Sequence, residues 1–170
     1  MNKVLGIVMG LSLATPAAAE PANLLGVFGN WTAYSSGTGS SLTCYALSKP
    51  RASRPTTAKR SAVYLMVSDW PSRKVKGEAQ VVYGYQAKEG GAAALGVGAD
   101  KFTFFIRNNG KEGSAWLQQL GDNARLITAM QEGVSAVASG VSMRNTKTSD
   151  TYSLSGFKDA LEKIHAVCQM

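Results

Sequence analysis

The stretch Ser149 to Cys168, SDTYSLSGFKDALEKIHAVC, decides the fold, because it joins a strand to an amphipathic helix that ends in a cysteine. Ser155 is placed to cap the first turn of this helix. The apolar residues recur at helical spacing: Phe157, Ala160, Leu161, Ile164, Val167 and Cys168. The pattern predicts a helix that packs on a core, with Cys168 pointing inward.

Residues 1–19 have the features of a cleaved signal peptide. Lys3 supplies a positive start, and the apolar run Val4 to Ala14 is too short to span a bilayer. Small residues at Ala17 to Ala19 predict cleavage before Glu20. Residues 20–170 are therefore expected to form one exported domain without a transmembrane segment. The predicted location is the periplasm, or a secreted or outer-membrane-associated position.

The two cysteines of an exported chain predict one disulfide, between Cys44 and Cys168. The bond would close a loop of about 120 residues, which is worth roughly 4–5 kcal/mol by chain-entropy arguments. The end of the chain is thus expected to be tied to its beginning.

Between the cysteines, short strand patterns separated by turn signals predict a mainly β protein. The expected strands are residues 27–35, 42–48, 62–70, 78–86, 101–107, 114–118, 134–143 and 150–154. Asn109-Gly110 is a hairpin signal, residues 49–60 are expected to form a loop, and residues 90–98 a connector or a poor strand. Asp122 can cap a short helix over residues 123–131 that Gly133 ends. The consecutive strands predict an antiparallel β-sandwich, with a barrel as the alternative.

The chain is basic, with a net charge of +7, and its positive residues are concentrated between positions 49 and 76. Such a surface would attract lipopolysaccharide, anionic lipid, peptidoglycan-associated polymers or host glycans. The candidate contact residues are Lys49, Arg51, Arg54, Lys59, Arg60, Arg73, Lys74 and Lys76. The alternative is a solvated basic loop that only aids solubility. Nucleic acid is not expected as a partner, because the chain is exported and shows no binding motif.

The sequence shows no catalytic motif. Ser155 to Lys158 matches S-x-x-K, but the Lys147-Thr148-Ser149 element precedes it, in the wrong order for penicillin-recognising enzymes. The acidic residues, Asp69 and Asp150 among them, are scattered, mostly at turns and helix faces, where capping and solvation explain them.

Metal and cofactor sites are not predicted either. His165 is the sole histidine, so no ligand cluster is formed, and we interpret it as a residue on the helix surface. Trp31, Trp70 and Trp116 could build a ligand platform, although core packing is the more common role at such strand positions.

Several segments resemble the invasion-associated locus B (IalB) family of exported alphaproteobacterial proteins. They are CYALSKP at 44–50, AVYLMV at 62–67, GY at 84–85 with KEG at 88–90, KFTFF at 101–105, AWL at 115–117, DTYSLSGF at 150–157 and the terminal Cys168. The resemblance runs from about Trp31 to Cys168. It implies an immunoglobulin-like β-sandwich with a disulfide, in the periplasm or at the outer surface. In some pathogens the family is associated with entry into host cells, notably red cells, whereas many relatives belong to free-living bacteria. The resemblance implies no catalytic residue in this chain.

Two functions remain open from the sequence. The first is a non-enzymatic periplasmic or surface-associated protein that acts in host-cell interaction or in the envelope through its basic surface. The alternative is a small envelope enzyme, or an inhibitor of one, with an unrecognised site.

Overall fold

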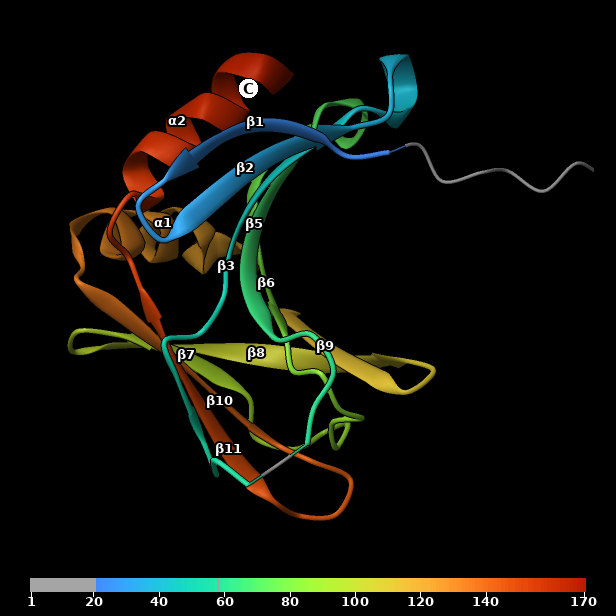
Figure 1. Cartoon of the computed structure of the whole chain (residues 1–170), viewed down its shortest axis with the longest axis vertical. Coiled ribbons are helices and arrows are strands. Elements are labelled where there is room, and N and C mark those ends of the chain that lie inside the picture. Colours follow the sequence, from blue (N-terminus) through green and yellow to red (C-terminus); the bar gives the residue numbers. More distant parts are fainter. Residues whose placement is uncertain (1–20, 58) are drawn as a thin grey trace, which may run out of the picture.

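The computed structural model describes residues 21–57 and 59–170, so the predicted signal peptide and its cleavage site lie outside the described residues. The strands are antiparallel throughout and join in the order β1-β2-β3-β5-β6-β9-β8-β7-β10-β11-β4 (Figure 1). Their bounds are β1 Asn23–Phe28, β2 Trp31–Ser36, β3 Thr43–Ser48, β4 Ala52–Arg54, β5 Tyr64–Trp70, β6 Val75–Val82, β7 Ala94–Val97, β8 Asp100–Asn109, β9 Glu112–Leu117, β10 Ser135–Val141 and β11 Lys147–Ser153. The helices are α1 Asn123–Glu132 and α2 Phe157–Cys168, with short 3-10 turns η1 Gly39–Ser41, η2 Pro71–Arg73 and η3 Leu120–Asp122.

Strand β8 belongs to both halves of the sheet. Its residues 104–109 pair with β9, and its residues 100–103 pair with β7. The two halves face each other: the Trp31 indole in β2 donates a 3.0 Å hydrogen bond to the Ser153 carbonyl in β11. The two layers of the expected sandwich are thus halves of one bent sheet. The predicted mainly β antiparallel fold, with a short helix and a C-terminal amphipathic helix, is confirmed.

One continuous core fills the space between the halves and the helices. Strand β8 follows its predicted alternation, with Phe102, Phe104 and Ile106 buried. The apolar face of α2 lies in the core as predicted, and the Phe157 ring packs 4.7 Å from the Trp31 ring between centroids.

The start of α2 differs from the prediction. The N-cap is Gly156, in a left-handed conformation with φ +86°, and the Ser155 side chain does not cap the helix. The Ser155 carbonyl instead accepts a 3.0 Å hydrogen bond from the Asn30 amide, which draws the β1–β2 turn against the start of α2. A side chain at position 156 would strike the Phe28 carbonyl oxygen, so only glycine fits this approach.

Three other predictions need correction. The single strand expected over 27–35 is a hairpin, because Gly29 turns the chain at φ +54°. The expected loop 49–60 contains β4, a short edge strand that pairs with β11. The Asp122 side chain does not cap α1, and its carboxylate accepts a 3.4 Å bond from Arg125 instead.

The Gly-Ala segment around β7 is an ordered strand between β8 and β10. In β10 the small residues Ala136, Ala138 and Gly140 face the core. A Cβ atom at Gly140 would lie 2.8 Å from the Tyr83 ring, so the large ring and the missing side chain are matched. In the part of the chain that the structure describes, we find no helix with the length and apolar character needed to cross a membrane.

Candidate functional site: a basic groove

A groove of about 830 Å³ lies where four loops meet beside the ends of β10 and β11. The loops are residues 55–61 before β5, 84–86 after β6, the β8–β9 turn at Lys111, and the β10–β11 turn at 142–146. Its basic lining residues are Lys59, Arg60, Lys111 and Arg144, and none of the described lining residues is acidic. The remaining lining is rich in hydroxyl and amide groups.

The segment that follows β6 holds these loops together. The Gly84 carbonyl accepts a 2.8 Å bond from the Ser61 amide, and the Gln86 carbonyl accepts a 3.0 Å bond from the Met143 amide. The Gln86 side chain in turn donates to the Gly110 carbonyl at 3.2 Å. One short segment therefore contacts the other three walls, and it fixes the distances between their basic residues.

A buried ion pair lies at the base of the groove. The Arg60 guanidinium donates two hydrogen bonds to the Asp150 carboxylate in β11, at 2.8 and 2.6 Å. The side chains are 6% and 0% exposed. The hydrogen bond to Asp150 raises the pKa of Arg60, so the guanidinium is charged at neutral pH. Because these charges offset each other, Arg60 adds little positive potential to the groove.

Tyr85 lies next to this pair and presents its ring to the groove. Its hydroxyl lies 2.6 Å from the Thr148 hydroxyl, and the Arg60 guanidinium carbon lies 5.9 Å from the ring centroid. Burial raises the pKa of Tyr85, which keeps the hydroxyl protonated at neutral pH. The groove thus combines a fixed aromatic ring with the exposed charges of Lys59, Lys111 and Arg144.

The eight basic residues predicted as a contact surface fall into two groups. The first, from Lys49 to Arg60, lies near the start of β5, and only Lys59 and Arg60 line the groove. The second group, Arg73, Lys74 and Lys76, lies beyond the other end of β5, roughly 20 Å away for a strand of this length. In that group the Arg73 guanidinium stacks 4.1 Å from the Trp70 ring centroid.

Two groove residues, Lys111 and Arg144, were not predicted from the sequence. Each is an isolated base at the tip of a turn, and no local pattern distinguishes it from an ordinary solubilising residue. The pairing of Ala87 with Ser142, outside the named strands, and of β8 with β9 helps to bring these two turns to the same place.

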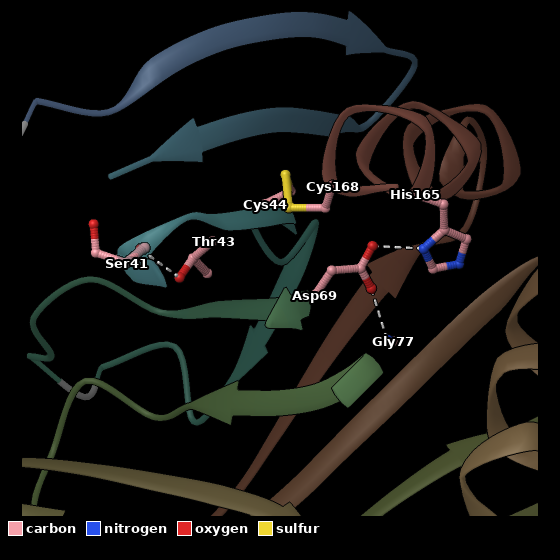
Figure 2. Close-up of a disulfide and its surroundings, with 7 residues drawn as sticks. All are labelled: Ser41, Thr43, Cys44, Asp69, Gly77, His165 and Cys168. Carbon is pink, nitrogen blue, oxygen red and sulfur yellow. Dashed lines mark hydrogen bonds and ion pairs between the residues drawn. A yellow bond between two sulfur atoms is a disulfide. The ribbon is translucent and has the colours of Figure 1, made fainter. Parts of the chain in front are cut away.

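A second cluster fixes the end of α2 (Figure 2). Cys44 in β3 and Cys168 in α2 form a disulfide across a sequence separation of 124 residues. Asp69, which pairs with Cys44 across β3 and β5, accepts a 2.6 Å hydrogen bond from His165 Nδ1 and a 2.8 Å bond from the Gly77 amide. The last turn of α2 is therefore joined to two neighbouring strands. His165 lies in the last turn of α2 and is partly exposed, as interpreted, although its ring also bonds to Asp69. The assignment of Asp69 to a solvated position is wrong, because Asp69 is fully buried.

The Asp69–His165 pair resembles the acid–base half of a hydrolase triad. Catalysis of that kind also needs a nucleophile on the other ring nitrogen. Among the described residues, Asp69 is the hydrogen-bond partner of the His165 ring, and no hydroxyl or thiol bonds to it. No group of three or more potential metal ligands occurs within residues 21–57 and 59–170. The pair is explained by its structural role at the helix end.

Comparisons with known proteins place the chain. The family model described as invasion associated locus B (IalB) protein matches residues 31–165. The chain belongs to the IalB family. This membership accounts for the resemblance seen in the sequence motifs. The family is a bacterial envelope or secreted type of protein and is not known as a family of enzymes.

The IalB fold is also recovered from solved structures. The crystal structure of invasion associated protein b from Bartonella henselae aligns with a TM-score of 0.58 at 13% identity, over 85% of this chain and 98% of that one. At this identity the similarity shows that the two proteins share a fold, and it does not show that they share a site. No curated protein matches the sequence.

Proposed function

We propose that this protein is an exported, non-enzymatic IalB-type protein of the periplasm or cell surface that binds an anionic polymer in its basic groove. The polymer would belong to the bacterial envelope or to a host-cell surface, since the Bartonella henselae relative is described as invasion associated. The supporting observation is the convergence of exposed Lys59, Lys111 and Arg144 from separate loops around Tyr85.

Three physical features favour an anionic chain over a small neutral ligand. The exposed bases point into one groove without an acidic neighbour among the described lining residues, so their potentials add. The groove is open and polar, which suits part of a long hydrated polymer. Hydroxyl and amide groups such as Thr146 and Gln86 can bond sugar hydroxyls or sulfate oxygens between the charged contacts.

The test is binding of heparin and of lipopolysaccharide, as two sulfated or phosphorylated probes, at low and high salt. The variant Lys59→Glu/Lys111→Glu/Arg144→Glu should bind at least tenfold more weakly, and its affinity should depend less on salt. Arg60 is left intact, because its partner Asp150 is buried.

The matched control is Arg73→Glu/Lys74→Glu/Lys76→Glu, which makes the same change in net charge at the far end of β5. It should keep most of the binding. Equal loss in both variants would mean that binding follows net charge and not the groove. Unchanged binding in the groove variant would refute the proposed site.

A further inference from the structure

Seven consecutive strands of the sheet, β1, β2, β3, β5, β6, β9 and β8, form its larger half. A row of paired residues crosses all seven strands on the side that faces away from the core. Pairing places them side by side as Val27, Thr32, Leu47, Met66, Gln80, Trp116 and Phe105. Directly opposed residues of antiparallel strands point to the same face. Adjoining rows add Leu24, Tyr34, Tyr45, Ser68 and Glu78 on one side, and Tyr64, Val82, Ser114 and Arg107 on the other. We call these three rows the outer face.

Most residues of the outer face are exposed or half-buried, whereas Ser68 and Val82, in the two adjoining rows, are buried. Leu24, Val27 and Phe105 are 57%, 68% and 39% exposed, whereas Phe104 and Ile106, which flank Phe105 in β8, are each 2% exposed. Figure 1 shows both helices on one side of β3, β5 and β6, and α1 and α2 supply their apolar residues to the core on that side. Trp70 and Trp116 belong to strands of this half-sheet and are only partly buried, so core packing holds for Trp31 alone.

The composition of this face is typical of the centre of a protein interface. Such centres are enriched in Tyr, Trp, Phe, Met and Arg and depleted in Lys, Asp and Glu. Tyr34 stacks on Tyr45 at 5.4 Å, and Phe105 stacks on Trp116 at 6.0 Å between ring centroids. These pairs hold the rings in fixed positions, so little side-chain entropy would be lost on docking.

The distribution of charge favours a second copy of this chain as the partner of the outer face. The chain carries a net charge of +7, so two copies repel each other over most approaches. The outer face carries one acid and one base, and each is engaged locally: Glu78 accepts a 3.1 Å bond from the Trp70 indole, and Arg107 lies 5.4 Å from the Phe105 ring centroid. A neutral apolar sheet face adds no local charge repulsion when two basic copies meet, and it offers no charged feature for an anionic partner.

We propose that the outer face is a self-association surface, on which two copies of this chain pack sheet against sheet about a two-fold axis. Seven strands about 4.8 Å apart and three rows of side chains give roughly 500 Å² per copy. The total of about 1,000 Å² lies at the lower limit for a specific interface, which predicts a reversible dimer in the micromolar range. Met66 stands at the centre of the middle row, so a two-fold axis there brings it close to its own copy.

Sedimentation equilibrium of the disulfide-bonded protein tests this from about 1 µM to about 1 mM, the range that brackets a micromolar dissociation constant. The expected mass rises from one chain to two, and added salt leaves association unchanged or strengthens it. Met66→Glu, which sets like charges against each other, should weaken association at least tenfold. Phe105→Glu serves the same purpose at a more exposed position if Met66→Glu does not fold.

The matched control is Met143→Glu, at a methionine that is 56% exposed and lines the basic groove instead of the outer face. It should dimerise like the unaltered protein. A monomer at every concentration overturns the proposal, and so does a dimer that Met66→Glu and Met143→Glu affect equally. Loss of dimerisation on raising the salt also overturns it, because that indicates a charge-driven contact elsewhere. Polymer binding is scored separately, so the failure of one proposal leaves the other standing.

Discussion

Replacing Arg60 with methionine should destabilise the protein severely, because it leaves Asp150 buried without a countercharge. The carboxylate is 0% exposed and receives two short hydrogen bonds from this guanidinium. Removing one partner of such a buried pair costs about 3–5 kcal/mol. Since a domain of this size is stabilised by about 5–15 kcal/mol, the variant would lose a large part of its stability.

The double variant Arg60→Met/Asp150→Leu distinguishes the cost of an unpaired buried charge from the cost of changing the side chains at these two positions. Replacing both ionic groups with apolar side chains removes the unpaired charge, so we expect the double variant to be more stable than Arg60→Met alone. Arg51→Met is the control, because Arg51 is an exposed arginine just before β4. Its substitution should change the free energy of unfolding by less than about 0.5 kcal/mol.

The assay is urea unfolding at neutral pH with the disulfide intact, followed by tryptophan fluorescence and circular dichroism. A loss of less than about 1 kcal/mol in Arg60→Met would refute the reasoning, since an exposed ion pair behaves in that way. A double variant as unstable as the single one would also refute it. The result matters for function: a charge reversal at Arg60 would test folding and not binding.

Two further predictions concern the helix end and the buried tyrosines. Cys44→Ala/Cys168→Ala should lower the free energy of unfolding by roughly 4–5 kcal/mol, measured by urea titration beside the intact protein, because the bond closes a separation of 124 residues. Burial raises the pKa of Tyr83 and Tyr152 above the ordinary value of 10.0, so the unfolded chain loses these protons first. The contribution of these two tyrosines to stability should therefore be unchanged below about pH 10, and stability should fall as the pH rises above it, in urea titrations across that range. At neutral pH Tyr83→Phe should cost about 1 kcal/mol, since its hydroxyl donates to the Ser139 carbonyl at 2.9 Å, whereas Tyr152→Phe should cost less, since its hydroxyl has no partner among the described residues.

The sequence predicted the elements whose patterns are local. The alternation in β8 and the helical spacing in α2 each record a single face of a single element, and both appear as expected. The single strand predicted over residues 27–35 was wrong, because a backbone contact distant in sequence accompanies the turn of the chain there. Gly29 reverses the chain against the Ser155 carbonyl, and that contact joins residues more than a hundred positions apart.

The site depended even more on long-range pairing. Lys59 could be named from a dense basic segment, but Lys111 and Arg144 became relevant only when β8–β9 and β10–β11 brought their turns together. The buried acids were missed for a related reason. Asp69 and Asp150 have the same local appearance as surface acids, and their partners lie 96 and 90 residues away.

The two buried carboxylates of this predominantly basic chain each pair with a basic side chain inside the fold. Each acid neutralises or orients one inward-facing cationic or imidazole side chain, Arg60 at the groove base and His165 at the helix end. The remaining bases are left on the surface, where the groove loops gather three of them and the outer face excludes all but Arg107. The sheet thereby separates a charged surface suited to polymers from a neutral surface suited to its own copy. Because a dimer presents two grooves to one chain of repeating anions, self-association would raise the avidity of the first function without any new contact.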